Sequence, residues 1–135
     1  MKILVVDDDP VSREILRKIV SSTGEHQVTV AEDGATAWAY LDDPGRYFDV
    51  AFLDLSMPHP DGFELVQRIR QSPIHASTAI ILCTGSNDRA TITKAIQLGV
   101  RHYIVKPCTE AIVQAKLQQI QPAGCPVGER RIAGA

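Results

Sequence analysis

Apolar residues recur along the chain in short runs that have the length of a buried β-strand. Residues typical of turns or loops bound each run, and the aliphatic residues follow one another without alternating with polar ones. Such continuous runs are typical of strands that are covered on both faces. The pattern predicts five strands, at Ile3 to Val6, Val28 to Ala31, Val50 to Leu53, Ala79 to Cys83 and Tyr103 to Val105.

Between these runs, apolar residues are spaced as on one face of a helix. The groups are Val11, Ile15, Leu16, Ile19 and Val20; Phe63, Val66 and Ile69; Ile92, Ala95 and Ile96; and Ile112, Val113 and Leu117, with a weaker segment at Ala35 to Leu41. Before the first helix, Asp9 and Pro10 are residue types preferred at the N-cap and the first helical position. Strict alternation of strand and helix predicts a parallel sheet with helices on both faces, joined by right-handed crossovers.

Polar residues with useful chemistry follow several of the predicted strands. Asp7, Asp8 and Asp9 follow the first strand, Asp54 the third, Thr84 the fourth and Lys106 the fifth. Ligands of such sheets bind at the carboxyl ends of the strands, near the point where the strand order reverses. Taken singly, each of these residues is more often a cap, a turn former or a solvated charge. Taken together, they suit Mg²⁺-assisted phosphoryl transfer onto a carboxylate.

Composition narrows the class of protein. The 135 residues are 44% hydrophobic, which fits one globular domain. With 14 basic and 16 acidic residues and no basic cluster, the chain lacks the charge pattern of a nucleic-acid binder, so we expect no direct nucleic-acid partner. No apolar stretch approaches the roughly 20 residues of a membrane span, so we expect a cytoplasmic protein. Cys83, Cys108 and Cys125 show no metal-ligand spacing, in agreement with a reducing compartment. We expect one domain over residues 1–121 and a Pro/Gly-rich tail or linker over residues 122–135.

Four motifs carry a resemblance to a known family. They are ILVVDDD at residues 3–9, LDLSMPHPDGFEL at 53–65, CTGS at 83–86 and YIVKP at 103–107. In order and spacing they resemble the receiver domain of two-component response regulators, in particular the single-domain chemotaxis regulators. The resemblance implies a flavodoxin-like, doubly wound sheet of five parallel strands in the order 2-1-3-4-5, flanked by five helices. It also implies a signalling domain that catalyses only its own phosphotransfer and autodephosphorylation, rather than an enzyme.

Carried over residue by residue, the resemblance makes Asp54 the phosphoryl acceptor. The donor would be a phosphohistidine on a sensor histidine kinase or a histidine phosphotransfer protein. Asp8, Asp54 and the backbone carbonyl of Ser56 would bind Mg²⁺ or Mn²⁺ directly, and Asp7 would act through metal-bound water. Several waters and a few protein oxygens are the usual coordination of Mg²⁺.

The same resemblance assigns the remaining site residues. Thr84 and Lys106 would contact the phosphoryl oxygens, and Tyr103 would turn from an exposed to a buried rotamer when the domain is phosphorylated. The bond between Lys106 and Pro107 would be cis, and Asp9 would be the N-cap of the first helix. The switched surface would act on a downstream protein target or on an output domain that is absent from this chain.

Two alternatives stay open at the level of sequence. Asp7, Asp9 and Val11 match the first-strand motif of haloacid-dehalogenase-type phosphatases, although that reading lacks later acidic ligands and leaves Asp54 unexplained. A receiver-shaped binding module that is never phosphorylated, or a dinucleotide binder, is disfavoured by the complete site and by the absence of phosphate-binding glycine motifs. Cys108 departs from the family, whose members usually carry a larger apolar residue after the Lys-Pro pair.

Overall fold

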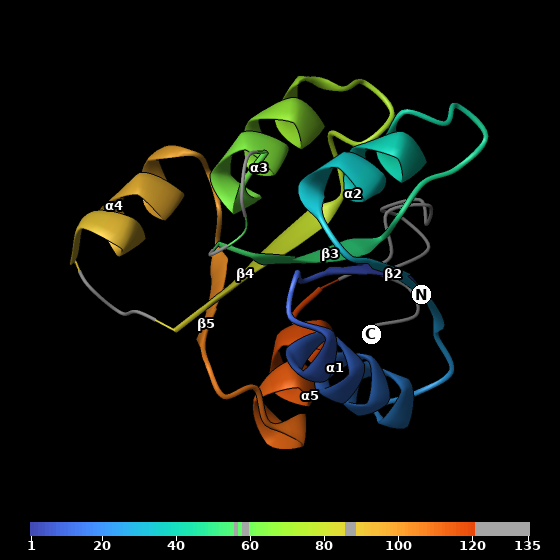
Figure 1. Ribbon diagram of the computed structural model, residues 1–135, viewed down its shortest axis with the longest axis vertical. Helices are drawn as coiled ribbons and strands as arrows, with labels where there is room; N and C mark the ends of the chain where they lie inside the picture. The colour runs from blue at the N-terminus through green and yellow to red at the C-terminus, as the bar shows by residue number, and fades with distance from the viewer. Residues whose placement is uncertain (56, 58–59, 86–88, 121–135) are drawn as a thin grey trace, which may run out of the picture.

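Strands and helices alternate along the whole described chain (Figure 1). The computed structural model describes residues 1–55, 57, 60–85 and 89–120. The strands are β1 Lys2–Val6, β2 Gln27–Ala31, β3 Val50–Asp54, β4 Ala79–Thr84 and β5 His102–Val105. The helices are α1 Pro10–Ser22, α2 Gly34–Leu41, α3 Gly62–Gln71, α4 Arg89–Gln97 and α5 Glu110–Gln118. No helix in the described ranges is long and apolar enough to cross a membrane.

The strands form one parallel sheet in the order β2-β1-β3-β4-β5, which confirms the predicted fold. Each strand is slightly longer than its apolar run. Lys2 pairs with Gln27 at one end of the sheet, and Thr84 pairs with Val105 at the other. The ladder can include these polar residues because it is made by backbone N–H and C=O groups, which every residue type but proline supplies.

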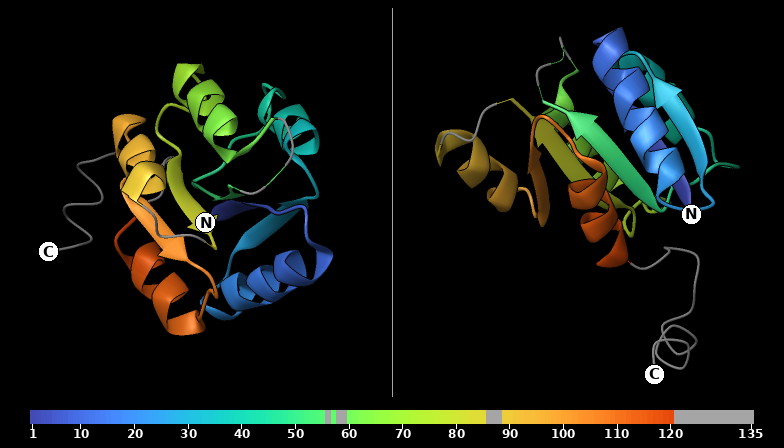
Figure 2. Two further views of the ribbon diagram at one scale, coloured as in Figure 1. Left: turned by 60° about the vertical axis from the view of Figure 1, so that its left-hand side comes forward. Right: turned by 90° about the horizontal axis from the view of Figure 1, so that it is seen from below.

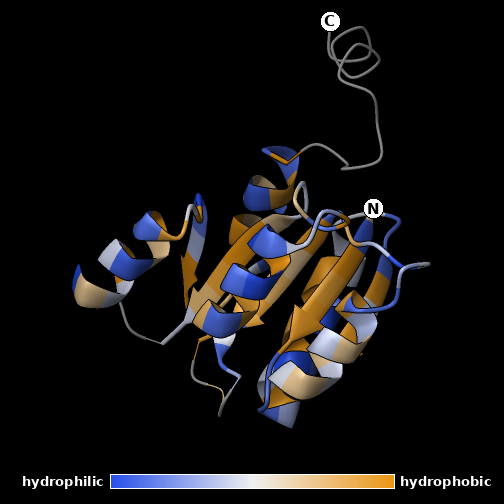
Figure 3. Ribbon diagram, turned by 90° about the horizontal axis from the view of Figure 1, so that it is seen from above, coloured by the Kyte–Doolittle hydropathy of each residue, from blue (hydrophilic) through white to orange (hydrophobic). Residues whose placement is uncertain are grey.

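Helices cover both faces of the sheet, as Figures 1 and 2 show from different sides. Successive residues of a strand point to opposite faces. In β1, Leu4 and Val6 pack into the core shared with α2 and α3, while Ile3 and Val5 pack into the core shared with α1 and α5. Two apolar cores therefore sit on either side of one sheet, and the strands are apolar along most of their length (Figure 3).

The apolar face of α1 is only partly used in the core. Leu16 and Val20 are buried, whereas Val11 and Ile15 are 66% and 51% exposed. Helical spacing alone placed these residues on one stripe. Val11 and Ile15 lie in the first turns of α1, which start just beyond the end of β1, so the sheet offers them less surface to pack against.

Candidate functional site

Three carboxylates meet at the carboxyl end of the sheet. Asp7 follows β1 and Asp54 ends β3, and these two strands are neighbours. One carboxylate oxygen from each of Asp7, Asp8 and Asp54 lies within 4.8 Å of the other two. Asp7 and Asp54 are buried, at 2% and 3% exposure, while Asp8 is exposed. Burial removes the water that would solvate these carboxylates and screen their mutual repulsion. Carboxylates this close therefore need positive charge nearby.

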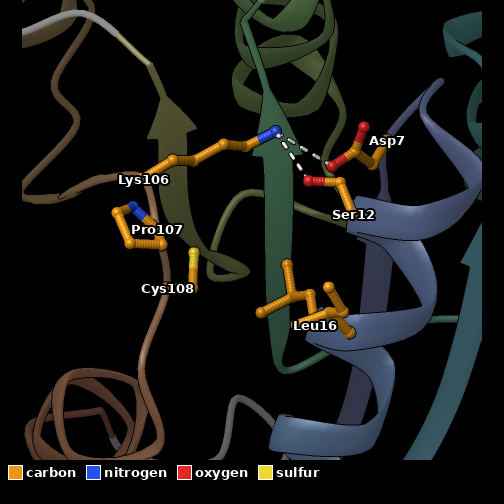
Figure 4. A pocket seen from close by; sticks show the side chains of 7 residues that line it. Asp7, Ser12, Leu16, Lys106, Pro107 and Cys108 are labelled. Carbon is orange, nitrogen blue, oxygen red and sulfur yellow. Dashed lines mark hydrogen bonds and ion pairs between the residues drawn. The ribbon is translucent and has the colours of Figure 1, made fainter.

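Lys106 supplies one such charge from the end of β5. Its Nζ donates a hydrogen bond to Asp7 Oδ2 at 3.1 Å and to Ser12 Oγ at 3.3 Å (Figure 4), and it lies 3.6 Å from Asp54 Oδ2. Burial lowers the pKa of the Lys106 ammonium, but the hydrogen bond to Asp7 and the negative charges of Asp54 and Asp7 outweigh it and raise the pKa above its usual value. Lys106 therefore carries its charge at neutral pH.

The third consecutive acid serves the backbone. The Asp9 carboxylate accepts hydrogen bonds from the backbone N–H groups of Val11 and Ser12, both at 3.3 Å, and Asp9 is the N-cap of α1. The Asp9 N–H in turn donates to Asp7 Oδ1 at 2.9 Å. Of the three neighbouring aspartates, two belong to the carboxylate cluster, and one caps the helix and orients its neighbour.

The last two strands carry the predicted hydroxyl and aromatic residues. Thr84 ends β4 and is buried, and its carbonyl accepts a hydrogen bond of 2.7 Å from the Lys106 N–H. Tyr103 in β5 is partly buried and packs against the core beneath α2 and α3. The peptide bond between Lys106 and Pro107 is cis. Ser56, expected to offer a carbonyl to the metal, lies outside the described residues.

Two neighbours of the site were not anticipated from the sequence. Ser12 accepts a hydrogen bond from Lys106, a contact that depends on how α1 approaches the end of β5. Gly62 lies so close to β3 that an added Cβ would stand 2.7 Å from the Asp54 carbonyl oxygen and 2.8 Å from Leu55 Cδ2. The position of Gly62 at the start of α3 could have been predicted from the sequence. Asp61 and Glu64 have the spacing of a capping box, and the structure contains that capping box.

The donor set suits a hard divalent cation. Magnesium and manganese prefer carboxylate, carbonyl and water oxygens, and the three clustered aspartates provide carboxylates from two adjacent strand ends. A cation there would also reduce repulsion between Asp7 and Asp54. The arrangement thus combines an acidic cluster suited to a metal ion, a buried carboxylate that can act as a nucleophile, and a lysine that can form ion pairs with negatively charged oxygens.

A cavity of about 310 Å³ opens beside Lys106, between α1 and the segment after β5 (Figure 4). Its lining is Asp7, Ser12, Ile15, Leu16, Lys106, Pro107 and Cys108. Hydrogen bonding with Cys83 and the nearby Lys106 charge lower the pKa of Cys108 and outweigh the effect of its burial. Hydrogen bonding with Cys108 and burial raise the pKa of Cys83.

Comparison with known proteins agrees with this geometry. The family model of the response regulator receiver domain matches residues 3–118. A chemotaxis protein CheY homolog of Campylobacter jejuni is 34% identical over 124 residues, which cover 92% of this chain and 95% of that protein. The solved structure of the Vibrio cholerae chemotaxis response regulator CheY4 superposes with a TM-score of 0.79 at 28% identity, covering 89% of this chain and 98% of that one.

One relative is much longer than this chain. The 3',5'-cyclic-nucleotide phosphodiesterase regA of Dictyostelium discoideum is 31% identical over 121 residues, which cover 89% of this chain but 15% of that protein. The match therefore concerns the shared domain.

These findings settle the choice between a receiver and a phosphatase. The matched family spans both cores and every strand end that contributes to the site, and its members are phospho-accepting signalling domains rather than conventional enzymes. The haloacid-dehalogenase alternative required Asp54 to have no role, yet Asp54 lies inside the acidic cluster beside Lys106. The chain belongs to the response regulator receiver domain family.

Proposed function

We propose that Asp54 accepts a phosphoryl group from a phosphohistidine on a sensor histidine kinase or a histidine phosphotransfer protein. The observation that carries this proposal is the position of Asp54, a buried strand-end carboxylate within the acidic cluster and 3.6 Å from Lys106. An Asp54 oxygen attacks phosphorus as the bond from phosphorus to the imidazole nitrogen breaks. The imidazole leaves with the electron pair of that bond, and an acyl phosphate remains on Asp54.

The acidic cluster supports a divalent cation, Mg²⁺ or Mn²⁺, as the cofactor of this reaction. Asp8 and Asp54 would bind it directly, together with the Ser56 backbone carbonyl that the family resemblance implies, and Asp7 would hold metal-bound water. When bound, the cation supplies positive charge that stabilises the oxygens of the transferring phosphoryl group. Because Asp7 and Asp54 are buried, the negative charge of an added phosphoryl group needs the positive charge of the cation beside it.

Lys106 and Thr84 are suited to bind the oxygens of the new phosphoryl group. The Lys106 ammonium already lies between Asp7 and Asp54, so it can form an ion pair with a phosphoryl oxygen by a short movement. The Thr84 hydroxyl gains an acceptor of high charge, and its movement leaves room for Tyr103 to turn inward. Since Tyr103 lies in β5, the change reaches the surface formed by α4, β5 and α5, where a downstream protein target would bind.

The proposed receiver domain occupies residues 1–121, and residues 122–135 would be a tail or linker. The family match over residues 3–118 supports this division. The output is a downstream protein partner or an output domain outside this chain, and direct contact with nucleic acid is not part of the proposal, because the 14 basic residues of the chain form no cluster in the sequence.

The test is phosphoryl labelling with a small donor. With Mg²⁺ and acetyl phosphate, the protein should gain one base-labile phosphoryl group that mass spectrometry maps to Asp54. Asp54→Asn preserves shape but removes the nucleophile and should abolish labelling. Asp9→Asn is the matched control, since Asn caps a helix about as well as Asp, and it should label normally. Labelling of Asp7, or undiminished labelling of Asp54→Asn, would contradict the proposal.

A further inference from the structure

Two cysteines lie together behind the acidic cluster. Cys83 is the penultimate residue of β4 and is 2% exposed, and Cys108 follows the Lys106-Pro107 pair and is partly buried. In the parallel pairing of β4 with β5, Cys83 stands opposite Ile104, which precedes Cys108 by four residues. Both side chains belong to the core under α1 and α5. A backbone hydrogen bond of 2.7 Å from the Lys106 N–H to the Thr84 carbonyl holds the segments that carry them side by side. They are therefore neighbouring thiols of one core.

The two thiols differ in access. Cys108 lines the cavity of about 310 Å³ between α1 and the segment after β5, and its sulfur is seen beside that space in Figure 4. Cys83 is not among the residues that line this cavity. A water molecule occupies about 30 Å³ of liquid, so the cavity has room for a small oxidant next to Cys108. A reagent that enters this cavity meets Cys108 first.

The surroundings of Cys108 favour its reactive form. The Lys106 ammonium lines the same cavity, and a nearby lysine stabilises a thiolate, which is the nucleophilic form of cysteine. The hydrogen bond from the Cys83 thiol stabilises the Cys108 thiolate in the same way, and the pKa of Cys108 is lowered accordingly. Cys108 thus has access from the cavity, a cationic neighbour and a second thiol in the same core.

We propose that Cys108 and Cys83 form a peroxide-oxidisable dithiol, with Cys108 as the thiol attacked from the cavity and Cys83 as the resolving thiol. The Cys108 sulfur attacks one oxygen of hydrogen peroxide, the O–O bond breaks, and after protonation water leaves and Cys108 is a sulfenic acid. The Cys83 sulfur then attacks the Cys108 sulfur, and the hydroxyl leaves as a second water. In total, two thiols lose two electrons and two protons, and one peroxide becomes two waters.

The resulting disulfide would join two segments that both reach the acidic cluster. It needs the two sulfur atoms to close to about 2.05 Å within the core that both side chains share. Cys83 precedes Thr84, and Cys108 lies two residues after Lys106. The bond would therefore tie the end of β4 to the segment after β5, directly beneath the site.

The test uses the full chain with Cys125→Ser, so that Cys83 and Cys108 are the only thiols. After treatment with hydrogen peroxide, both free thiols should be lost, the intact monomer should lose the mass of two hydrogen atoms, and a reductant should restore both. Peptide mapping should find Cys83 joined to Cys108 within one chain. Over-oxidation of Cys108 while Cys83 keeps its free thiol would overturn the proposal, and this readout needs no substitution in the core.

Two further variants assign the order of attack. In the same background, Cys83→Ala should accumulate a sulfenic acid on Cys108, trapped by dimedone, because no resolving thiol remains. Cys108→Ser should leave Cys83 largely unoxidised, since Cys83 does not line the cavity. Equally fast oxidation of Cys83 in Cys108→Ser would contradict the assigned roles. Circular dichroism shows whether both variants are folded. If either is unfolded, the disulfide map of the Cys125→Ser protein tests the proposal.

Discussion

The ammonium of Lys106 donates a hydrogen bond of 3.1 Å to Asp7, although the two residues are 99 positions apart in sequence. The contact joins the end of β5 to the end of β1, across the position of Asp54 at the end of β3. Lys106 thereby compensates two buried carboxylates, and the site is held together by charge before any phosphoryl group arrives.

Replacing Lys106 should destabilise the protein when no divalent cation is present. Lys106→Ala removes the ammonium that faces the buried Asp7 and Asp54, and we expect the free energy of unfolding to fall by about 1 to 3 kcal/mol in chemical denaturation. Adding Mg²⁺ should recover part of that loss, because a bound cation also neutralises the cluster. The exposed Lys18 of α1 offers a control, since Lys18→Ala should change stability by no more than about 0.5 kcal/mol. Similar losses for both variants would show that Lys106 has no special role in stability.

Mg²⁺ should stabilise the protein through the acidic cluster. A ligand that binds only the folded state adds about 2.7 kcal/mol to the free energy of unfolding at one hundred times its Kd. Asp8→Asn should remove most of this gain, while its metal-free stability should match or exceed that of the parent, because one like charge has been removed.

The control for this experiment is the neighbouring Asp9. Asp9→Asn alters an acid of the same motif that caps α1 instead of joining the cluster, so the rise of the melting temperature with Mg²⁺ should persist. A full response in Asp8→Asn, or a lost response in Asp9→Asn, would place the metal elsewhere.

A phosphoryl mimic should perturb residues beyond the immediate site. Beryllofluoride with Mg²⁺ should shift backbone amide signals in β4 and β5, including Thr84 and Tyr103, as well as those next to Asp54. The physical reason is that the Thr84 hydroxyl gains a charged acceptor and Tyr103 repacks behind it. The measurement is a two-dimensional NMR spectrum of the labelled protein. Shifts limited to the neighbours of Asp54 would argue against a propagated switch, and Asp54→Asn should show none.

Adding a methyl group at Gly62 should disturb the backbone that carries Asp54. The new Cβ would lie 2.7 Å from the Asp54 carbonyl oxygen, so the strand or α3 must shift. Overpacking of this kind costs about 1 to 3 kcal/mol, and thermal or chemical unfolding of Gly62→Ala should show that loss. Gly85 is the matched control, because a Cβ there would meet no atom within 4 Å. If Gly62→Ala were as stable as Gly85→Ala, the close approach of α3 to β3 would be wrong.

The sequence alone determined the kinds of element and the residues that each would deliver. Short aliphatic runs and helical spacing are local patterns, so they locate strands and helices whatever the strand order. The Asp9-Pro10 pair likewise marks the start of α1, because N-capping involves only neighbouring backbone groups. The carboxyl end of each strand also follows from the sequence to within one residue, and with it the inventory of Asp7, Asp8, Asp54, Thr84 and Lys106.

The tertiary structure decided which of these residues meet. Alternation of strands and helices is compatible with several strand orders. In the observed order β2-β1-β3-β4-β5, Asp54 lies between Asp7 on one side and Thr84 on the other. The contact of Lys106 with Ser12 and the placement of Cys83 and Cys108 in one core leave no periodic trace in the sequence. Such contacts join elements that are far apart along the chain, and their geometry is fixed only when the helices pack on the sheet.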